Sequence, residues 1–388
     1  MSAPGARTLA VLGSTGSIGV QALEVAAAAG ERVRVTALAA GGRLDELCAQ
    51  ARRVRPAWLA LEHAADAARA RAALEEASPG ARAWVGPGAT ARLAAECGAA
   101  VVLNGVVGAA ALEASLATLE RGARLALANK ETLVIGGALV RRALARGGEL
   151  VPVDSEHSAA FQCLGGRDAR AVERLTLTAS GGALRRHPDW RRATIEEVLA
   201  HPVWSMGRRI TVDSALLFNK GLEILEAHEL FELAWERLDA VLHPEALVHA
   251  LVTFRDGSTV LQAAVPDMRL PIQVALAWPE RWGKAARALE PRDLAGLTFA
   301  PIEPGEHPAF DLALEAGRRG GTAPCVLNAA DEVAVECFLE GQVALGAVPE
   351  IVERVLDAHA PEPVESLAQL REWDRRAREE ARAAVARV

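Results

Sequence analysis

The chain has 388 residues, of which 51% are hydrophobic, and its formal net charge is −7. This length predicts two or three domains with sizeable cores, and without any block of basic residues neither nucleic acid nor an anionic membrane is an expected partner. No apolar run is long enough for a membrane span, and none predicts a signal peptide. Five scattered cysteines predict a reducing, cytoplasmic location without disulfides or a zinc site. The lack of tyrosine excludes a reductase that relies on a catalytic tyrosine.

A glycine-rich turn, GSTGSIG at 13–19, separates a short apolar strand over 8–12 from an alanine-rich helix over 20–29. Strand, turn and helix in this order predict the start of a dinucleotide-binding unit. The glycines let backbone N–H groups approach a pyrophosphate at the helix N-terminus. Thr15 and Ser17 add hydroxyl donors. A plain tight turn is the alternative interpretation.

The second expected strand, 33–39, leads into Ala40, Gly41, Gly42 and Arg43. NAD enzymes usually carry a carboxylate at this point, where it binds the ribose hydroxyls. Here an arginine follows instead, which favours the 2′-phosphate of NADP because a guanidinium matches phosphate geometry. Alternatively, Arg43 is a surface residue that opens the next helix.

Strands expected at 58–61, 83–85, 101–103 and 124–128 alternate with helices and predict a doubly wound parallel sheet up to about residue 150. The last of these strands leads into Asn129, Lys130 and Glu131. Ligands collect at the carboxyl ends of such strands, so these side chains are placed beside the nicotinamide. As the alternative, Asn129 caps a helix and the other two are surface charges.

The segment PVDSEH, 152–157, reads as the end of another short strand. Side chains two apart on a strand share a face, so Asp154 and Glu156 are expected to point the same way. Two neighbouring carboxylates repel unless a proton or cation lies between them, and Mg²⁺ or Mn²⁺ prefers such oxygen ligands. A solvated strand end is the alternative.

Further along the chain, a strand over 175–178 ends in ASGG, which is either an anion-binding turn or an ordinary one. The segment HPVWSMG, 201–207, has no helical or strand period, which is typical of a loop packed on the core or a lid over a site. In the helix that follows, Asn219, Lys220 and Glu223 share a face, whereas a surface salt-bridge pattern is the alternative. Gly221 in mid-helix indicates close packing.

The last third of the chain begins with a β-hairpin, 248–254 with 259–263, joined by an Asp-Gly turn. Residues 280–305 show little periodicity and are expected to be a linker. From 306 to 388 the pattern is helical throughout, which predicts a small helical bundle.

The motifs GSTGSIG, LANKE, PVDSEH, ASGG, HPVWSMG, VDS, NKGLE, PDMRLPI and LNAADE follow one another in this order. Together they resemble the 1-deoxy-D-xylulose 5-phosphate reductoisomerase family. The resemblance implies an α/β homodimer: a Rossmann-like NADPH domain over 1–150, a central α/β catalytic domain over 151–279 with a lid loop at about 198–208, the linker 280–305, and a C-terminal four-helix bundle over 306–388.

The resemblance also implies a set of site residues. The metal, Mn²⁺ or Mg²⁺ with Co²⁺ as a further option, would be bound by Asp154, Glu156 and Glu223. The catalytic set would be these three with Lys130 and His201. The substrate would contact Lys130, Ser155, Glu156, Ser180, His201, Trp204, Ser214, Asn219, Lys220 and Glu223. NADPH would contact Thr15, Gly16, Ser17, Ile18, Gly41, Arg43, Asn129, Glu131 and Gly207.

The implied reaction rearranges 1-deoxy-D-xylulose 5-phosphate and reduces the product to 2-C-methyl-D-erythritol 4-phosphate in the non-mevalonate isoprenoid pathway. Two alternatives are another metal-assisted NADP reductase of a sugar phosphate and a non-catalytic NADPH-binding sensor on the same fold. The chain departs from the family pattern at Val203, where the lid usually has Asn, and at Ala183 and Leu184, which replace the usual Pro-Phe. The usual Gly-Lys-Asn after the second strand is Gly-Gly-Arg here.

Overall fold

The computed structural model describes residues 5–204 and 206–387. Ser205 of the expected lid loop, residues 1–4 of the first expected domain and Val388 of the last lie outside the described residues. The chain forms two compact units, and each is described by itself. The first comprises the described residues of Met1–Thr132, Val140–Ser158 and Asp267–Arg287; the second comprises Leu133–Leu139, Ala159–Pro266 and those of Ala288–Val388.

The first unit is built on a seven-stranded parallel sheet in the order β4-β3-β2-β1-β5-β6-β7. The strands are β1 (Arg7–Leu12), β2 (Val33–Ala40), β3 (Trp58–Leu61), β4 (Arg82–Val85), β5 (Val101–Asn104), β6 (Arg124–Leu127) and β7 (Glu149–Pro152). This order confirms the expected doubly wound sheet. Its switch point, where such sheets bind ligands, lies between β1 and β5.

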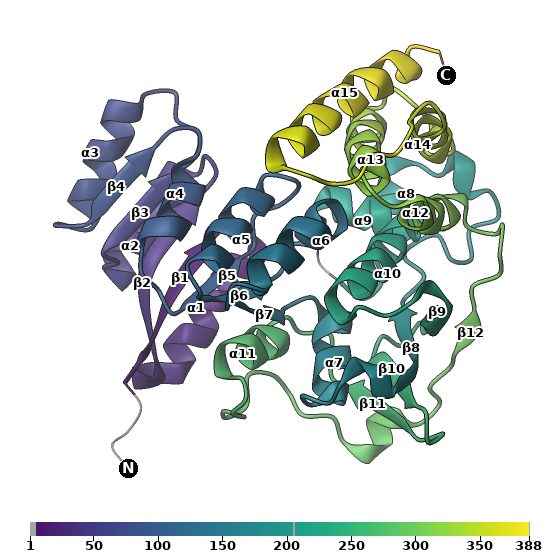
Figure 1. Cartoon of the computed structure of the whole chain (residues 1–388), viewed down its shortest axis with the longest axis horizontal. Coiled ribbons are helices and arrows are strands. Elements are labelled where there is room, and N and C mark those ends of the chain that lie inside the picture. The colour runs from purple at the N-terminus through teal and green to yellow at the C-terminus, as the bar shows by residue number, and fades with distance from the viewer. Residues whose placement is uncertain (1–4, 205, 388) are drawn as a thin grey trace. The chain divides into compact units, whose positions relative to one another are not determined.

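Helices alternate with these strands, as Figure 1 shows. They are α1 (Ser17–Ala29), α2 (Leu44–Val54), α3 (Ala67–Ala77), α4 (Ala89–Glu96) and α5 (Ala111–Glu120), with the 3₁₀ turn η1 (Gly30–Arg32). Two further helices, α6 (Glu131–Leu144) and α7 (Ser155–Leu164), contain residues of both units. The alanines of α1 that are buried in this unit let the helix lie close to the strands.

A later segment of the chain, Asp267–Arg287, clusters with the first unit, although the sequence analysis placed 267–279 in the second domain. Its helix α11 (Arg269–Ala277) packs against α1 through buried apolar side chains. Arg7 Nη1 donates to the carbonyl of Leu276 at 2.5 Å, and Arg124 Nη1 donates to that of Trp278 at 2.9 Å. These long-range contacts explain the grouping, and no local sequence pattern indicates them.

The second unit contains a five-stranded mixed sheet in the order β11-β10-β8-β9-β12. The strands are β8 (Val172–Ala179), β9 (Leu238–Leu242), β10 (Val248–Phe254), β11 (Thr259–Ala263) and β12 (Ala300–Pro301). The expected hairpin is confirmed as β10 and β11, which pair antiparallel. The residues expected to form a linker contribute β12, because the backbone there pairs with β9 although the side chains show no strand period.

The helices of the second unit gather around one large apolar core (Figure 1). They are α8 (Ile195–Leu199), α9 (Arg208–Ala215), α10 (Phe218–Phe231), α12 (Pro308–Arg319), α13 (Ala323–Leu339), α14 (Ala347–Asp357) and α15 (Leu367–Val385). The 3₁₀ turns are η2 (Ala169–Ala171), η3 (Trp190–Arg192), η4 (Trp235–Arg237) and η5 (Pro291–Leu294). Helices α12–α15 form the expected C-terminal helical region.

Gly221 confirms the expected close packing, because a Cβ added there would lie 2.4 Å from the Cβ of Ala313 on α12.

Among the described residues, none of the helices combines the length and the hydrophobicity that a membrane span requires.

Candidate active site

The PVDSEH segment folds differently from the expectation. Strand β7 ends at Pro152 and α7 already begins at Ser155, so strand alternation does not place Asp154 and Glu156 on one face. The reason is that Asp154 caps the helix: its Oδ1 accepts from the backbone N–H groups of Glu156 at 3.2 Å and His157 at 3.5 Å. An aspartate before a helix satisfies donors that have no partner within the first turn.

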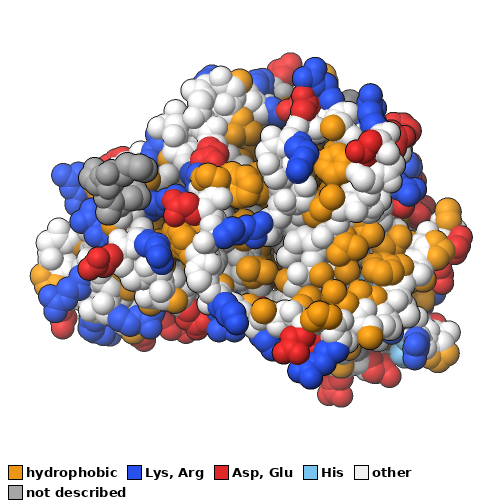
Figure 2. Space-filling view, turned by 90° about the horizontal axis from the view of Figure 1, so that it is seen from below, with side chains coloured by type: hydrophobic (Ala, Val, Ile, Leu, Met, Phe, Trp, Pro, Cys, Tyr) orange, Lys and Arg blue, Asp and Glu red, His pale blue; other side chains and the backbone are white. Residues whose placement is uncertain are grey.

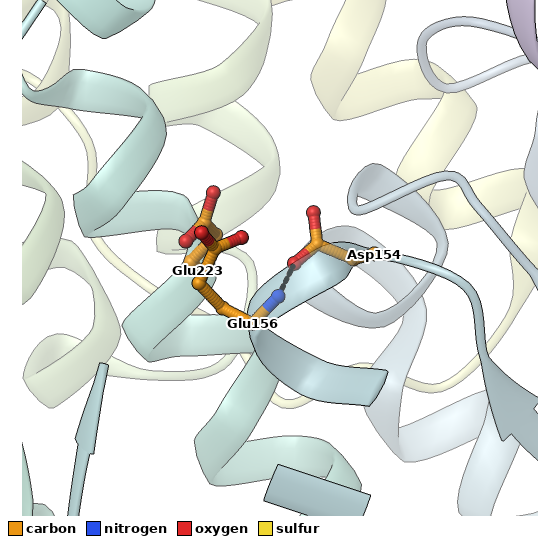
Figure 3. Close-up of side chains that lie close together, drawn as sticks. All are labelled: Asp154, Glu156 and Glu223. Carbon is orange, nitrogen blue, oxygen red and sulfur yellow. Dashed lines mark hydrogen bonds between the residues drawn. The ribbon is translucent and has the colours of Figure 1, made fainter. Parts of the chain in front are cut away.

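The two carboxylates nevertheless lie in one cluster with Glu223 (Figure 3). Asp154, Glu156 and Glu223 each offer a ligand oxygen, and these atoms lie within 4.8 Å of one another. Helix α7 places Glu156 because its later turn, from Ala159 to Leu164, belongs to the same buried cluster as residues of α10 such as Ile224.

Two lysines compensate the negative charge of this cluster. Lys130 Nζ lies 2.5 Å from Asp154 Oδ2, and Lys220 pairs with Glu223 three residues later on the same helix. Burial alone would raise the pKa of the Asp154 carboxyl, but Lys130 and His157 outweigh it and hold that pKa well below its usual range. Three converging oxygen ligands, one of them firmly ionised, fit a hard divalent cation.

Asn219, Lys220 and Glu223 converge as the sequence pattern predicts, and they are not a surface salt-bridge pattern. Asn219 Nδ2 donates to Glu223 Oε1 at 2.6 Å, and the side chains of Lys220 and Glu223 are buried. Burying a charge is costly unless it is paired, and here Lys220 and Glu223 pair with each other.

The turn after β8 brings Ser180 against α9. Gly181 and Gly182 both have positive φ, and a Cβ at Gly182 would lie 2.6 Å from the carbonyl oxygen of Ser214. Only glycine permits this approach. The Ser180 hydroxyl lies 3.2 Å from His201 Nε2 and accepts from the backbone N–H of Gly182 at 3.3 Å. The turn that contains Ser180 thus lies against the end of α9 that contains Ser214.

His201 accepts hydrogen bonds from backbone groups of the loop that follows α8. Its Nδ1 accepts from the backbone N–H groups of Val203 at 3.2 Å and Trp204 at 2.9 Å. Burial lowers the pKa of His201, which favours the neutral ring that these bonds require. Trp204 is half-buried, and the centroid of its ring lies 6.4 Å from that of His249.

At the first glycine turn, α1 begins at Ser17 with Gly16 as its N-cap, and no side chain caps it. A Cβ on Gly19 would lie 2.3 Å from the carbonyl oxygen of Gly13, so the turn requires glycine for close packing of helix on strand. Thr15 is buried and Ser17 is exposed beside this helix end. The helix N-terminus therefore keeps backbone donors available for an anion.

Asn129, Lys130 and Glu131 of the LANKE motif differ in their structural roles. Asn129 is a helix cap, since its Oδ1 accepts from the backbone N–H and hydroxyl of Thr132, both at 2.7 Å. Its Nδ2 donates to Glu131 Oε2 at 2.6 Å, and both side chains are buried. Lys130 faces Asp154. The alternative is thus right for Asn129 as a cap and wrong for the two charges as surface residues.

Arg43 precedes α2 and is exposed, with Nε 3.1 Å from Glu46 Oε2. Gly41 is exposed just before it, at the end of β2. Arg43 is thus a surface residue that opens a helix, as the alternative interpretation of the sequence has it. It also follows the end of β2, and the cofactor ribose is bound at this strand end in doubly wound sheets.

Three family models match successive parts of the chain. "1-deoxy-D-xylulose 5-phosphate reductoisomerase" matches residues 9–137, its C-terminal domain matches 150–231, and "DXP reductoisomerase C-terminal domain" matches 263–380. The 1-deoxy-D-xylulose 5-phosphate reductoisomerase of Moorella thermoacetica is 49% identical over 93% of this chain and 94% of its own length. The chain belongs to the 1-deoxy-D-xylulose 5-phosphate reductoisomerase family.

Further relatives agree. The reductoisomerase of Xanthomonas campestris is 45% identical over all of this chain and 98% of its own. The solved reductoisomerase of Zymomonas mobilis in complex with NADPH superimposes with a TM-score of 0.91 at 36% identity, covering 98% of this chain and 99% of that one. A reductoisomerase in complex with NADPH, fosmidomycin and magnesium gives a TM-score of 0.91 at 33% identity, covering 98% of both chains.

Two histidines that the sequence analysis did not select lie beside residues of the candidate site. His157 is fully buried and its Nδ1 lies 2.8 Å from Asp154 Oδ1. His249 is buried on β10 next to Trp204. The position of His157 inside PVDSEH, next to the acidic pair, is a signal that could have found it. Nothing in the strand pattern around His249 distinguishes it from a core residue.

The half-buried position of Trp204 within the HPVWSMG segment leads to a prediction. We expect Trp204→Ala to change the free energy of unfolding by less than about 0.5 kcal/mol, as surface substitutions do. We expect kcat/KM to fall at least about tenfold, equivalent to ~1.4 kcal/mol of transition-state stabilisation, because the family resemblance implies that the indole contacts the substrate. Thermal unfolding and steady-state kinetics measure the two effects.

Trp190→Ala is the matched control, because Trp190 packs against the large apolar core. It should lower the melting temperature and preserve activity per folded molecule. The same pattern in Trp204→Ala would show that Trp204 is a core residue.

Proposed function

We propose that this chain converts 1-deoxy-D-xylulose 5-phosphate into 2-C-methyl-D-erythritol 4-phosphate with NADPH and a divalent cation, in the non-mevalonate isoprenoid pathway. The observation that carries the proposal is the Asp154, Glu156 and Glu223 cluster in a chain that matches reductoisomerases over its full length. A sensor that only bound NADPH would have no use for three converging carboxylates.

In this proposal Asp154, Glu156 and Glu223 hold Mg²⁺ or Mn²⁺, with Co²⁺ as a further option. The cation supplies Lewis acidity toward the carbonyl and neighbouring hydroxyl of the substrate. Lys130, now paired with Asp154, provides an ammonium group for the substrate oxygens. Ser155, whose hydroxyl donates to Glu156 Oε2 at 2.7 Å, lies beside the same oxygens.

The substrate phosphate is held by Ser180, Ser214, Asn219 and Lys220. The glycine turn that brings Ser180 onto α9 supports the placement of both serines. The phosphate lies away from the reacting carbons, so its binding supplies energy that orients them. His201 and Trp204 cover the substrate and exclude water from it.

NADPH supplies the hydride and binds mainly to the domain over 1–150. Its pyrophosphate contacts the turn that contains Thr15, Gly16, Ser17 and Ile18, where the N-terminus of α1 keeps backbone donors. The remaining contacts come from Gly41, Arg43, Asn129, Glu131 and Gly207. The catalytic domain over 151–279 binds metal and substrate, although its residues 267–279 cluster with the first unit. The linker 280–305 and the helical region 306–388 follow it.

Oxidation of NADPH, followed by its absorbance, tests the function directly. With 1-deoxy-D-xylulose 5-phosphate and Mn²⁺ the enzyme should oxidise one NADPH per product formed. The same assay with a panel of other sugar phosphates tests the first alternative, another metal-assisted NADP reductase. A faster reaction with one of these sugar phosphates would show that the enzyme has a different substrate. NADPH binding without oxidation under any of these conditions would favour the sensor.

The carboxylate cluster leads to a second prediction. Asp154→Asn, Glu156→Gln and Glu223→Gln should each lower kcat by more than about 100-fold, because a missing ligand weakens the cation that the reaction needs. The dissociation constant for NADPH, measured by fluorescence, should change little because the dinucleotide contacts other residues.

Glu232→Gln is the control, since Glu232 is exposed at the end of the same helix as Glu223. It should behave as wild type. Full activity of the unmutated enzyme in excess EDTA would contradict the metal assignment.

Arg43 leads to a third prediction. The unmutated enzyme should prefer NADPH to NADH in kcat/KM, and Arg43→Asp should reduce that preference at least about tenfold, because a charge-assisted contact to the 2′-phosphate contributes ~1.5–3 kcal/mol. Glu46→Gln removes the partner of Arg43 and should keep the preference. Equal efficiency of the unmutated enzyme with both cofactors would refute the role of Arg43.

We also infer a homodimer that forms through the second unit, and a cytoplasmic location. Strand β11 ends its sheet, and it exposes Val260 and Leu261 at 41% and 49%. Figure 2, seen from below Figure 1, shows hydrophobic side chains gathered on that face. An apolar edge strand is a ready pairing surface. The five cysteines are all free thiols and buried, which suits a reducing compartment.

Analytical ultracentrifugation tests the dimer. The unmutated protein should sediment as a dimer at micromolar concentration, and Leu261→Lys should shift it toward the monomer because a charge is then buried in the interface. Leu294→Lys places the same charge at another exposed leucine and should leave the dimer intact. A monomeric unmutated protein would refute the inference.

A further inference from the structure

Helix α9 joins two parts of the proposed site. Its N-cap is Gly207, whose carbonyl accepts from the backbone N–H of Thr211 at 3.1 Å and from the Thr211 hydroxyl at 2.9 Å. Near its other end lies Ser214, against which the turn of Gly182 packs. A displacement of this helix would therefore move a proposed cofactor contact and a proposed phosphate contact together.

The helix has little local support of its own. It is only eight residues long, which is too short to be stable by itself in water, and no side chain caps its N-terminus. Two residues after it ends, Leu217 adopts a left-handed backbone with φ of 55°. Its position must therefore be set by packing and by side-chain contacts with the rest of the second unit.

Arg209 supplies these contacts to α13. Its Nη1 donates to Glu332 Oε1 at 2.8 Å, and its Nη2 donates to Asn328 Oδ1 at 3.2 Å and to Asp331 Oδ2 at 3.3 Å. All three partners belong to LNAADE, a motif to which neither the metal nor the phosphate assignment gives a role. On its own helix, Arg209 Nε lies 3.7 Å from Asp213 Oδ2.

Glu332 is a firmly held anchor. Its Oε2 accepts from Arg378 Nη2 on α15 at 2.5 Å, and its Oε1 accepts from Asn328 Nδ2 at 3.1 Å. Burial alone would raise the pKa of Glu332, but Arg209 and Arg378 outweigh it and hold that pKa below its usual value. The carboxylate that faces Arg209 is therefore ionised, and the oxygen that Arg209 contacts, Oε1, is also held by Asn328.

The pKa of the other buried carboxyl, that of Asp331, is shifted in the opposite direction. Burial raises its pKa well above the usual value, and the nearby Asp213 adds to the rise. Around Arg209, Glu332 is thus the carboxyl on α13 whose pKa is lowered, and Asp331 and Asn328 also accept hydrogen bonds from the guanidinium. A planar group with donors in several directions defines an orientation, which a single point charge does not.

We propose that Arg209 is a positioning residue for the reaction: through Glu332 and Asn328 it fixes α9 against α13, and so fixes Ser214 and Gly207 where the substrate phosphate and the cofactor need them. The inference rests on the proposed function. It assigns to LNAADE and the C-terminal helices a part in catalysis, although none of their residues touches the reacting atoms.

The experiment compares Arg209→Ala, Arg209→Lys and Arg378→Ala in the full-length enzyme with Mn²⁺ and NADPH, at a temperature where each is folded. Arg209→Ala should raise KM for 1-deoxy-D-xylulose 5-phosphate and lower kcat/KM by about 10- to 100-fold, the effect expected for a site misplaced by roughly 1 Å. Arg209→Lys should recover part of the loss because an ammonium still pairs with Glu332.

Arg378→Ala is the matched control, since it removes the other guanidinium from the same Glu332 without touching α9. It should lower the melting temperature but leave KM within about twofold of the unmutated value, because a stability loss alone does not change the binding of a folded molecule. An equal rise of KM in Arg378→Ala, or an unchanged KM in Arg209→Ala, would overturn the proposal.

Hydrogen exchange provides a readout that is independent of turnover. Backbone amides of α9 should exchange faster in Arg209→Ala than in the unmutated protein, whereas those of α10 should not change. If Arg209→Ala does not fold, Glu332→Gln replaces it. We then expect changes in KM, kcat/KM and the exchange of α9 in the same directions, but smaller. An inactive unmutated enzyme would refute the proposed function, while equal exchange of α9 in both proteins would refute the role of Arg209.

Discussion

Electrostatic repulsion among three carboxylates is the constraint around which the proposed site is arranged. Two unit charges 4 Å apart interact with about 4 kcal/mol at an effective dielectric constant of 20. Asp154, Glu156 and Glu223 can converge within 4.8 Å only because positive charge lies beside them. Lys130 and Lys220 supply it here. Any cation held by the cluster would release both ammonium groups, which could then bind a phosphorylated substrate.

Close backbone approaches give these side chains their positions. Gly182 lets the turn after β8 touch the backbone of α9, and Gly221 lets α10 approach α12 at Ala313. In both places a single Cβ would force the elements apart, and interiors packed to crystal density do not absorb such a change easily. The glycines therefore act on function indirectly, through the distance between the elements that carry the polar groups.

The sequence predicted the fold class well because the signals are local. Hydrophobic periodicity and glycine turns define the strands of the parallel sheet, and the 3.6-residue period brings Asn219 and Glu223 together. The prediction from the sequence failed where the same residues are compatible with both a strand and a helix. In PVDSEH the apolar lead suggested a strand, yet Asp154 is also a strong helix cap, and this capping decided the backbone.

Contacts between distant residues were beyond sequence reasoning altogether. Arg209 meets Asn328, Asp331 and Glu332, which are more than a hundred positions away. Asp267–Arg287 returns to the first unit through Arg7 and Arg124 for a similar reason. No periodicity records such pairs, since each partner alone looks like an ordinary helix or strand residue. The ordered motifs indicated a family, but not which of their residues act through others.

The Arg209 network also bears on why a bundle of helices would use buried charge at all. Replacing a buried ion pair by apolar side chains of similar volume is often neutral or stabilising, so stability alone does not explain it. Apolar contacts are non-directional, and a short helix held only by them could rotate or slide while burying nearly the same area. A guanidinium that meets Glu332 and Asn328 on one side allows one rotation of α9. Since Ser214 lies on that helix, the orientation fixed by the charged contact is the property that the substrate phosphate would sense.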